Sequence, residues 1–156
     1  MNVKDLMQSA EENRTPFYYY DMELLENTLN KLKYAADKYK YNVHYALKAN
    51  TNGRVLDLIS SYGFGADCVS GNEINKAVAH GFSPDEIAFA GVGKTDREIE
   101  VGLDNAIFCF NCESIQEIEV INEIATREGK VADIALRVNP NVDANTHRYI
   151  TTGTTE

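Results

Sequence analysis

The feature that most limits how this chain can fold is a regular alternation of short apolar segments and helical patterns. The predicted strands start 22, 22, 19 and 25 residues apart, at Val43–Leu47, Gly65–Val69, Ile87–Ala90, Ala106–Phe110 and Val131–Val138. Helical patterns lie between them, at Arg54–Tyr62, Glu73–His80, Asp96–Leu103 and Ser114–Glu128. Glycines suited to carboxy-terminal caps follow three of these helices, at Gly63, Gly81 and Gly129, and Ser114–Glu117 has the capping-box pattern at the start of the last helix. Such alternation predicts repeated βα units and a parallel sheet.

Two α/β architectures satisfy this pattern: an open doubly wound sheet and a (β/α)8 TIM barrel. The even spacing and the small residues at the strand ends favour the barrel. A closed barrel needs about 250 residues, whereas the chain has 156 residues and only about five βα units. The sequence therefore predicts the first part of a barrel.

The segment before the first unit has a different character. Residues 1–14 form a polar leader with some helical character, and Thr15–Asp21 has the pattern of a short aromatic strand that begins at a proline. Asp21 is placed to cap the next helix. In that helix, apolar residues at three- and four-residue spacing predict one buried stripe: Leu24, Leu25, Leu29, Leu32 and Ala36.

Composition narrows the classes of partner and compartment. The chain carries 15 Lys and Arg against 24 Asp and Glu, a net charge of −9. This charge disfavours nucleic acid and anionic membrane surfaces, and no apolar run has the length needed to cross a bilayer. Three cysteines, an odd number, are typical of free thiols in a reducing compartment. We expect a cytoplasmic protein.

Lys48 is the first candidate for a catalytic residue, because it directly follows the apolar strand Val43–Leu47. Packing of that strand is expected to remove water from the ammonium and favour the neutral amine, which is the nucleophile that forms a Schiff base with a carbonyl. Strand alternation puts Lys48 on the side of His44 and Ala46, and Ala46 leaves room for a large flat group. The simpler alternative is a lysine that reaches solvent from a strand end.

Other polar residues follow the remaining strands at the same predicted edge, where both architectures place their chemistry. Asp67 lies in an apolar run and so needs a cationic partner, for which Lys48 or Arg137 would serve; alternatively, it caps a loop. Arg137 must itself be paired or bind a ligand. The residues expected at this edge are Lys48, Asp67, Ser70, Gly91, Asn111, Arg137 and Asn139.

Two further motifs suggest other chemistry. Residues 88–95 lack only the first glycine of a phosphate-binding loop with Lys94 as its lysine, but no later strand ends in the aspartate that would hold magnesium. Cys109 and Cys112 have the C-x-x-C spacing, yet no second ligand pair completes a metal site, and a thioredoxin-like site would follow the first strand. These features argue against nucleotide hydrolysis and a metal site, and we expect both thiols to be structural.

With these residues in view, positions 15–153 resemble the amino-terminal part of the diaminopimelate decarboxylase family, in the alanine-racemase-like (fold-type III) class of pyridoxal-phosphate enzymes. The first motifs are shared with ornithine and arginine decarboxylases, and the last two are more particular to the diaminopimelate enzymes. The motifs are TPFYYYD (15–21), YALKAN (45–50), GADCVSGNE (65–73), FAGVGKT (89–95), LRVNP (136–140) and HRYITTG (147–153).

The resemblance implies a fold, a cofactor and residue roles. Residues 1–21 would contribute a strand to a β-rich second domain, and residues 22–156 would be the first part of the pyridoxal-phosphate-binding barrel. Lys48 would hold pyridoxal 5'-phosphate covalently and Ala46 would lie against it. Asp67 would lie beside the lysine and Arg137 near the ring, as polar members of the pocket.

The implied reaction is decarboxylation of meso-2,6-diaminopimelate to L-lysine and CO2 in lysine biosynthesis, by a homodimer with shared active sites. A sister decarboxylase of arginine, ornithine or carboxynorspermidine is the alternative, as is a non-catalytic homologue of the same fold. The phosphate-binding glycines, the acid at the ring nitrogen, the ring-stacking histidine and the partner-supplied cysteine of this class have no counterpart in the chain. We therefore expect the chain alone to be inactive.

Overall fold

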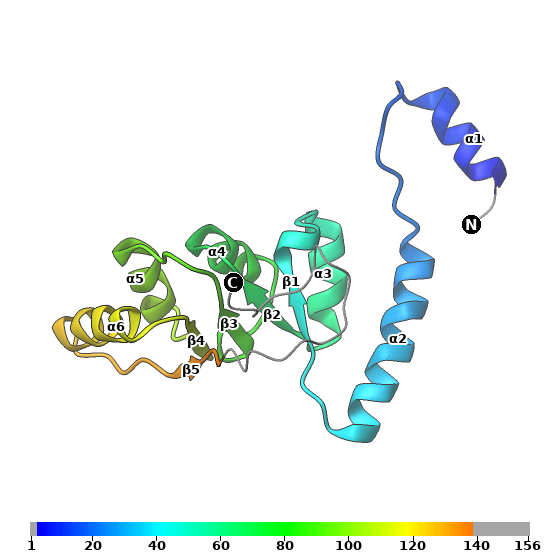
Figure 1. Ribbon diagram of the computed structural model, residues 1–156. Coiled ribbons are helices and arrows are strands. Elements are labelled where there is room, and N and C mark those ends of the chain that lie inside the picture. The colour runs from blue at the N-terminus through cyan, green and yellow to red at the C-terminus, as the bar shows by residue number, and fades with distance from the viewer. Residues whose placement is uncertain (1–2, 139–156) are drawn as a thin grey trace, which may run out of the picture.

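The computed structural model describes residues 3–138, so Asn139 and the motif at 147–153 lie outside the described residues. Its helices are α1 (Val3–Glu12), α2 (Met22–Tyr39), α3 (Gly53–Ser61), α4 (Gly71–Ala79), α5 (Asp96–Asp104) and α6 (Ile115–Arg127). Its strands are β1 (His44–Ala46), β2 (Gly65–Cys68), β3 (Ile87–Phe89), β4 (Cys109–Cys112) and β5 (Ile134–Leu136), with short 3-10 helices η1 (Leu47–Ala49) and η2 (Pro84–Glu86). Each predicted element of the repeated units is present (Figure 1).

All five strands differ from their predicted bounds, and β2 and β3 each end one residue earlier than predicted. β1 ends at Ala46, because the chain turns there into the 3-10 helix η1. β4 begins three residues later than predicted, because Ala106 adopts a φ of 50° in the turn after α5. β5 covers only Ile134–Leu136 of the predicted Val131–Val138.

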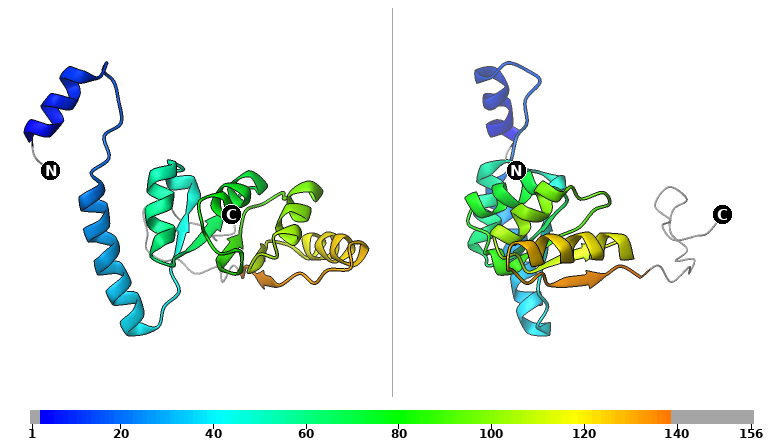
Figure 2. Two further views of the ribbon diagram at one scale, coloured as in Figure 1. Left: turned by 180° about the vertical axis from the view of Figure 1, so that it is seen from behind. Right: turned by 90° about the vertical axis from the view of Figure 1, so that its left-hand side faces the viewer.

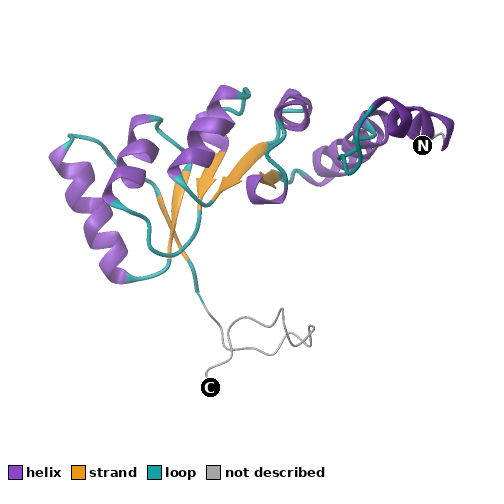
Figure 3. Cartoon of the chain, turned by 90° about the horizontal axis from the view of Figure 1, so that it is seen from above, coloured by secondary structure: helices purple, strands orange, loops and turns teal. Residues whose placement is uncertain are grey.

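The five strands form one parallel sheet in the order β1-β2-β3-β4-β5. Figure 3 shows α3 to α6 on one side of this sheet. A doubly wound sheet carries helices on both faces and reverses its strand order, whereas a barrel adds strands in sequence and keeps its helices outside. Of the two architectures that satisfy the sequence pattern, the described residues therefore confirm the beginning of the α/β barrel.

The two faces of the sheet carry different side chains. The face under the helices holds large or fully buried residues, namely Ala66, Cys68, Ile87, Phe89, Phe110 and Cys112. The opposite face carries a row of small or polar residues that are paired in register from β1 to β4: Ala46 with Asp67, Asp67 with Ala88, and Ala88 with Cys109. The first face supplies the hydrophobic core, and the second has the small and polar side chains expected of a ligand-facing surface.

Local sequence signals at the helix ends act as predicted. Gly63, Gly81 and Gly129 have φ angles of 69°, 83° and 66° after α3, α4 and α6, a conformation that glycine adopts without steric cost. The Asp21 side chain accepts a hydrogen bond of 2.9 Å from the backbone N–H of Leu24 at the start of α2.

The amino-terminal segment differs from the predictions in two respects. Residues 15–21 form no strand, because they hydrogen-bond to no neighbouring strand within the described residues; their assignment to a second domain stays a prediction. The predicted stripe on α2 is only partly buried: Leu29 and Ala36 are buried, whereas Leu24 and Leu32 are 61% and 41% exposed.

The reason for this exposure is that α2 makes its main contacts, among the described elements, with α3. The Tyr62 hydroxyl, just after α3, donates to Oδ1 of Asn30 at 3.1 Å, and Figures 1 and 2 show α1 and the amino-terminal half of α2 standing away from the sheet. No helix within residues 3–138 combines the length and apolar character needed to span a membrane.

Cys68 and Cys112 belong to the packed core under the helices, whereas Cys109 lies on the opposite face of the sheet. Cys68, Cys109 and Cys112 are free and buried. Burial raises the pKa of Cys68 to about 12, and it also raises the pKa values of Cys109 and Cys112. Buried thiols with raised pKa values are poor nucleophiles and poor metal ligands, which fits the structural role predicted for the C-x-x-C pair.

Gly102 in α5 provides a test of how closely the helices pack on the sheet. A methyl group at this position would lie 2.6 Å from Cζ of Phe110 in β4. We predict that Gly102→Ala lowers the free energy of unfolding by about 1–3 kcal/mol through overpacking, despite a helix-propensity gain of about 1 kcal/mol. Urea denaturation of the chain would measure this change.

The matched control is Glu119→Ala, an exposed site in α6, which should alter stability by less than about 0.5 kcal/mol. In a Phe110→Leu background, Gly102→Ala should lower the free energy of unfolding by less, because the leucine side chain leaves room for the methyl group. A stabilising effect of Gly102→Ala in the wild-type background would contradict the packing described here.

Candidate functional site at the carboxyl ends of the strands

The structure brings the predicted site residues to one edge of the sheet but does not pair them with one another. Lys48 follows β1, Asp67 lies in β2, and Arg137 follows β5. Within residues 3–138, the side chain of Lys48 makes no hydrogen bond or ion pair, and neither does that of Asp67. The prediction that Asp67 pairs with Lys48 or Arg137 is therefore wrong for the described part of the chain.

Lys48 lies in the 3-10 helix η1 and its side chain is exposed. The prediction that strand packing would remove water from its ammonium is thus wrong for the described residues, because β1 ends two positions earlier and the chain turns away. Leu47 beside it is completely buried and anchors the turn in the core. The amine is consequently held at the sheet edge and is accessible to a ligand.

Hydrogen bonds on both sides fix the turn that carries Lys48. The Tyr45 hydroxyl donates to the backbone carbonyl of Asn50 at 3.1 Å, and the Asn50 N–H donates to the carbonyl of Leu47 at 3.1 Å. The Asn50 side-chain amide also donates to the Tyr20 hydroxyl at 3.2 Å. Burial raises the pKa of the Tyr45 phenol, so it stays a hydrogen-bond donor at neutral pH.

Ala46 and Asp67 are direct neighbours on the face of the sheet that α3 to α6 leave open. They are register partners on β1 and β2, and Ala88 is the partner of Asp67 on β3. Asp67 is partly buried between these two alanines. The arrangement leaves space above a carboxylate that has no cation attached within the described residues.

Arg137 is held by β4 and by Glu113, the residue that follows β4. Its backbone N–H donates to the carbonyl of Cys112 at 3.0 Å, and its Nη1 lies 3.2 Å from Oε1 of Glu113. The prediction that Arg137 must be paired or bind a ligand is met by Glu113. The guanidinium is still 59% exposed, so it can also bind an anion.

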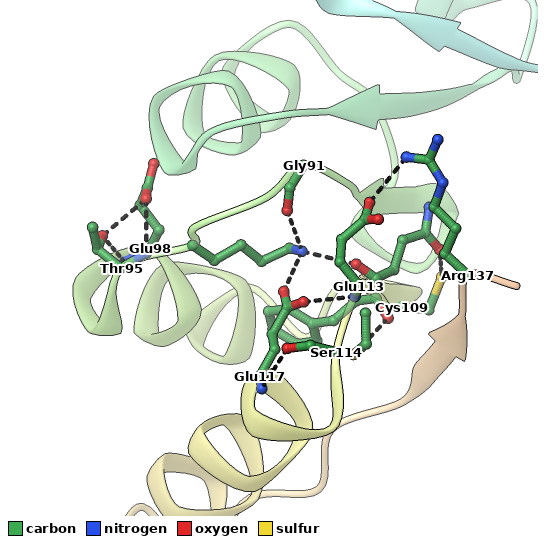
Figure 4. Close-up of polar contacts among 12 residues, drawn as sticks. Gly91, Thr95, Glu98, Cys109, Glu113, Ser114, Glu117 and Arg137 are labelled. Atoms are coloured by element: carbon green, nitrogen blue, oxygen red, sulfur yellow. Dashed lines mark hydrogen bonds and ion pairs between the residues drawn. The ribbon is translucent and has the colours of Figure 1, made fainter. Parts of the chain in front are cut away.

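Lys94, the lysine of the phosphate-loop-like motif, points inward. Its side chain is 1% exposed, and Nζ donates to the carbonyls of Gly91 at 2.9 Å and Asn111 at 2.8 Å. Nζ also pairs with Oε1 of Glu117 at 2.6 Å, as Figure 4 shows. A lysine with all three donors used cannot cradle a phosphate, and this strengthens the prediction against a nucleotide loop.

A polar motif that was predicted only at Ser114–Glu117 is repeated at this edge of the sheet. Three successive helices begin with Ser/Thr-x-x-Glu, at Ser70–Glu73, Thr95–Glu98 and Ser114–Glu117. In each, the Ser or Thr oxygen accepts the backbone N–H of the Glu. The pattern follows β2, β3 and β4, whereas Asn52 caps the helix after β1. This repetition could have been found from the sequence.

The glutamates of this motif differ in what they bind. Glu98 completes a capping box with Thr95 and also accepts the N–H of Gly71 at 3.1 Å, and these backbone hydrogen bonds lower its pKa. Glu117, predicted to complete a box with Ser114, instead accepts the N–H of Glu113 at 2.7 Å and the ammonium of Lys94. The predicted cap by Ser114 is confirmed, but the second half of that box is replaced by a buried ion pair.

These residues fit a flat anionic cofactor with a reactive carbonyl. Lys48 offers an exposed amine, and Arg137 offers an exposed cation at the same edge. On the open face, the small side chains of Ala46 and Ala88 lie on either side of Asp67. Pyridoxal phosphate is a cofactor of this kind, because it reacts through an aldehyde with a lysine amine.

Comparison with known proteins identifies the family of the chain. The chain is 56% identical over 144 residues to the diaminopimelate decarboxylase of Bacteroides thetaiotaomicron, and the match covers 92% of this chain and 37% of that protein. It is 43% identical over 153 residues to the enzyme of the same name from Aquifex aeolicus, with 98% and 35% covered. The chain thus spans just over a third of the length of the curated relatives it matches.

A solved structure supports the same relation. The crystal structure of diaminopimelate decarboxylase from Helicobacter pylori complexed with L-lysine superposes with a TM-score of 0.83 at 41% identity, covering 99% of this chain and 39% of that one. Residues 23–156 match the family model described as "Pyridoxal-dependent decarboxylase, pyridoxal binding domain". The chain therefore belongs to the family of pyridoxal-dependent decarboxylases, and residues 23–156 are the part that matches its pyridoxal-binding domain.

Proposed function

We propose that this chain is the cofactor-binding part of a pyridoxal 5'-phosphate-dependent decarboxylase that converts meso-2,6-diaminopimelate to L-lysine and CO2. The observation that carries the proposal is the exposed, unpaired amine of Lys48 at the carboxyl end of β1, in a chain that belongs to this family. Lysine biosynthesis is the corresponding cellular role.

Lys48 is the residue that attaches the cofactor. Its amine makes no ion pair within the described residues, so it can react with an aldehyde without first breaking one. The anchored turn between Tyr45 and Asn50 holds the amine at the sheet edge before the cofactor arrives, which reduces the ordering cost of binding.

The other proposed residues shape and charge the pocket around Lys48. Ala46 leaves space for the flat ring, and Asp67, its register partner, supplies a carboxylate on the same face. Arg137 supplies a cation at the opposite end of the described edge. Pyridoxal phosphate, when bound, withdraws electrons from the substrate as its carboxylate leaves as CO2. The chain's own residues orient the reactants, and this orientation favours decarboxylation over competing reactions.

The named relatives favour diaminopimelate over the sister substrates. Relatives at 56% and 43% identity are diaminopimelate decarboxylases, whereas the viral arginine decarboxylase structure is 23% identical and supports the fold alone. The intact set of Lys48, Asp67 and Arg137 disfavours a non-catalytic homologue.

We further propose a cytoplasmic homodimer with shared active sites and a small amino acid as its ligand. Free, buried thiols suit a reducing compartment. The net charge of −9 does not favour nucleic acid or an anionic membrane as a partner.

Cofactor titration of the full-length polypeptide that carries this chain tests the role of Lys48. We predict that Lys48→Ala weakens binding of pyridoxal phosphate by at least about 100-fold and abolishes the absorbance of the lysine-bound cofactor, because the covalent bond is lost. The matched control, Lys31→Ala, removes an exposed lysine of α2 and should leave both unchanged. Equal binding by wild type and Lys48→Ala would refute the assignment.

Substrate choice is tested by measuring CO2 release from a small panel of amino acids by the same polypeptide. Turnover of meso-diaminopimelate should exceed that of arginine, ornithine and carboxynorspermidine by at least about 100-fold in kcat/KM, since a site built for polar groups rejects analogues that lack them. Faster turnover of arginine, ornithine or carboxynorspermidine would identify that compound, and not diaminopimelate, as the substrate. No turnover of any, with the cofactor bound, would favour a non-catalytic homologue.

A further inference from the structure

We propose that Lys94 and Glu117 are positioning residues of the candidate site: their buried ion pair fixes the loop after β3 and, through Glu113, the orientation of Arg137. This inference rests on the proposed function, because it concerns how the cofactor pocket is held in shape. Neither residue lies among those proposed to touch the cofactor.

A chain of hydrogen bonds leads from Lys94 to the guanidinium of Arg137 (Figure 4). Lys94 Nζ lies 2.6 Å from Oε1 of Glu117, and the second oxygen of Glu117 accepts the N–H of Glu113 at 2.7 Å. The Glu113 side chain then accepts from Arg137 Nη1 at 3.2 Å. Each link is charged or has a charged acceptor, and such hydrogen bonds are shorter and stronger than neutral ones.

A second route reaches Arg137 through the backbone. Lys94 Nζ donates to the carbonyl of Asn111 at 2.8 Å, and Asn111 precedes Cys112, whose carbonyl accepts the N–H of Arg137 at 3.0 Å. Both the main chain and the side chain of Arg137 are therefore linked to the same buried ammonium.

The loop before Lys94 depends on this anchor. Gly91 and Gly93 have φ angles of 105° and 71°, and Val92 between them is 81% exposed. Glycines restrict the backbone little and Val92 adds hardly any packing, so the inward-pointing Lys94, which also bonds the Gly91 carbonyl at 2.9 Å, holds the loop in one conformation.

Burial distinguishes the Lys94–Glu117 ion pair from an ordinary surface ion pair between neighbouring βα units. The side chains of Lys94 and Glu117, which join the loop after β3 to α6, are 1% and 12% exposed. Those of Arg127 and Glu100, which join α6 to α5, are 55% and 38% exposed. A buried pair is little screened by salt and keeps a defined geometry. The exposed pair lies at the carboxyl end of α6, away from the candidate site, and therefore provides a matched control.

The test compares Lys94→Met with Arg127→Met in the full-length polypeptide, by cofactor titration and by hydrogen exchange at the Glu113 amide. Lys94→Met should raise the dissociation constant for pyridoxal phosphate by about tenfold or more, as expected for a misplaced pocket residue, and should speed exchange at Glu113. The cofactor should still attach at Lys48. Arg127→Met should leave both measurements within about twofold of wild type.

A double variant separates positioning from stability. Lys94→Met alone leaves a buried, unpaired carboxylate, which is costly, so weaker binding could come from partial unfolding. Lys94→Met with Glu117→Met removes both charges and should recover most of the thermal unfolding temperature. Because the hydrogen bond to the Glu113 N–H remains lost, cofactor affinity should stay about tenfold below that of the wild type. Hydrogen exchange at the Glu113 amide should stay faster than in the wild type.

The outcomes distinguish this inference from the proposed function. Wild-type cofactor affinity in the folded double variant would overturn the positioning role and leave the role of Lys48 intact. Recovery of affinity in step with stability would also overturn it. Failure of the wild-type protein itself to bind pyridoxal phosphate would refute the proposed function and this inference together.

Discussion

The structure depends on a sheet whose two faces differ in chemistry. One face carries Ile87, Phe89 and Phe110, which bury themselves under the helices. The other carries Ala46, Asp67 and Ala88, paired in register across three strands. Apolar burial drives the helices onto the first face only, and this one-sided packing is what sets a growing barrel apart from a doubly wound sheet. The site follows from it, because small and polar residues remain on the face that the helices do not cover.

Polar residues at the carboxyl edge divide into two groups with different tasks. Lys48 and Arg137 are exposed and can reach a ligand. Lys94 and Glu117 are turned inward and connect neighbouring βα units. Exposed groups alone would be poorly oriented, since long cationic side chains have many rotamers. The buried pair restricts the backbone that carries Arg137, in agreement with the general need for a supporting shell behind a functional site.

Local signals in the sequence predicted much of this arrangement. Periodicity predicted the five strands and the four helices between them, and Asp21, Gly63 and Ser114 acted at helix ends as their residue types indicate. These features depend on near neighbours in the chain. The resemblance to pyridoxal-phosphate decarboxylases, read from short motifs, agrees with the family match over residues 23–156.

Features that depend on tertiary packing could not be predicted in the same way. The exposure of Lys48 follows from a 3-10 turn that strand alternation does not reveal, and Leu24 stays exposed because α2 packs mainly on α3. Glu117 was expected to bond its own helix start, but Lys94, 23 positions earlier, competes for it. Which acceptor a charged side chain selects is decided by burial and distance, and neither can be read from spacing.

The central claim is that one amine, Lys48, carries pyridoxal phosphate. Borohydride reduction of the full-length polypeptide loaded with the cofactor, followed by peptide mapping, tests it most directly because reduction makes the attachment permanent. The account predicts one modified peptide, which contains Lys48. Modification at Lys94, at another lysine, or at none would contradict it.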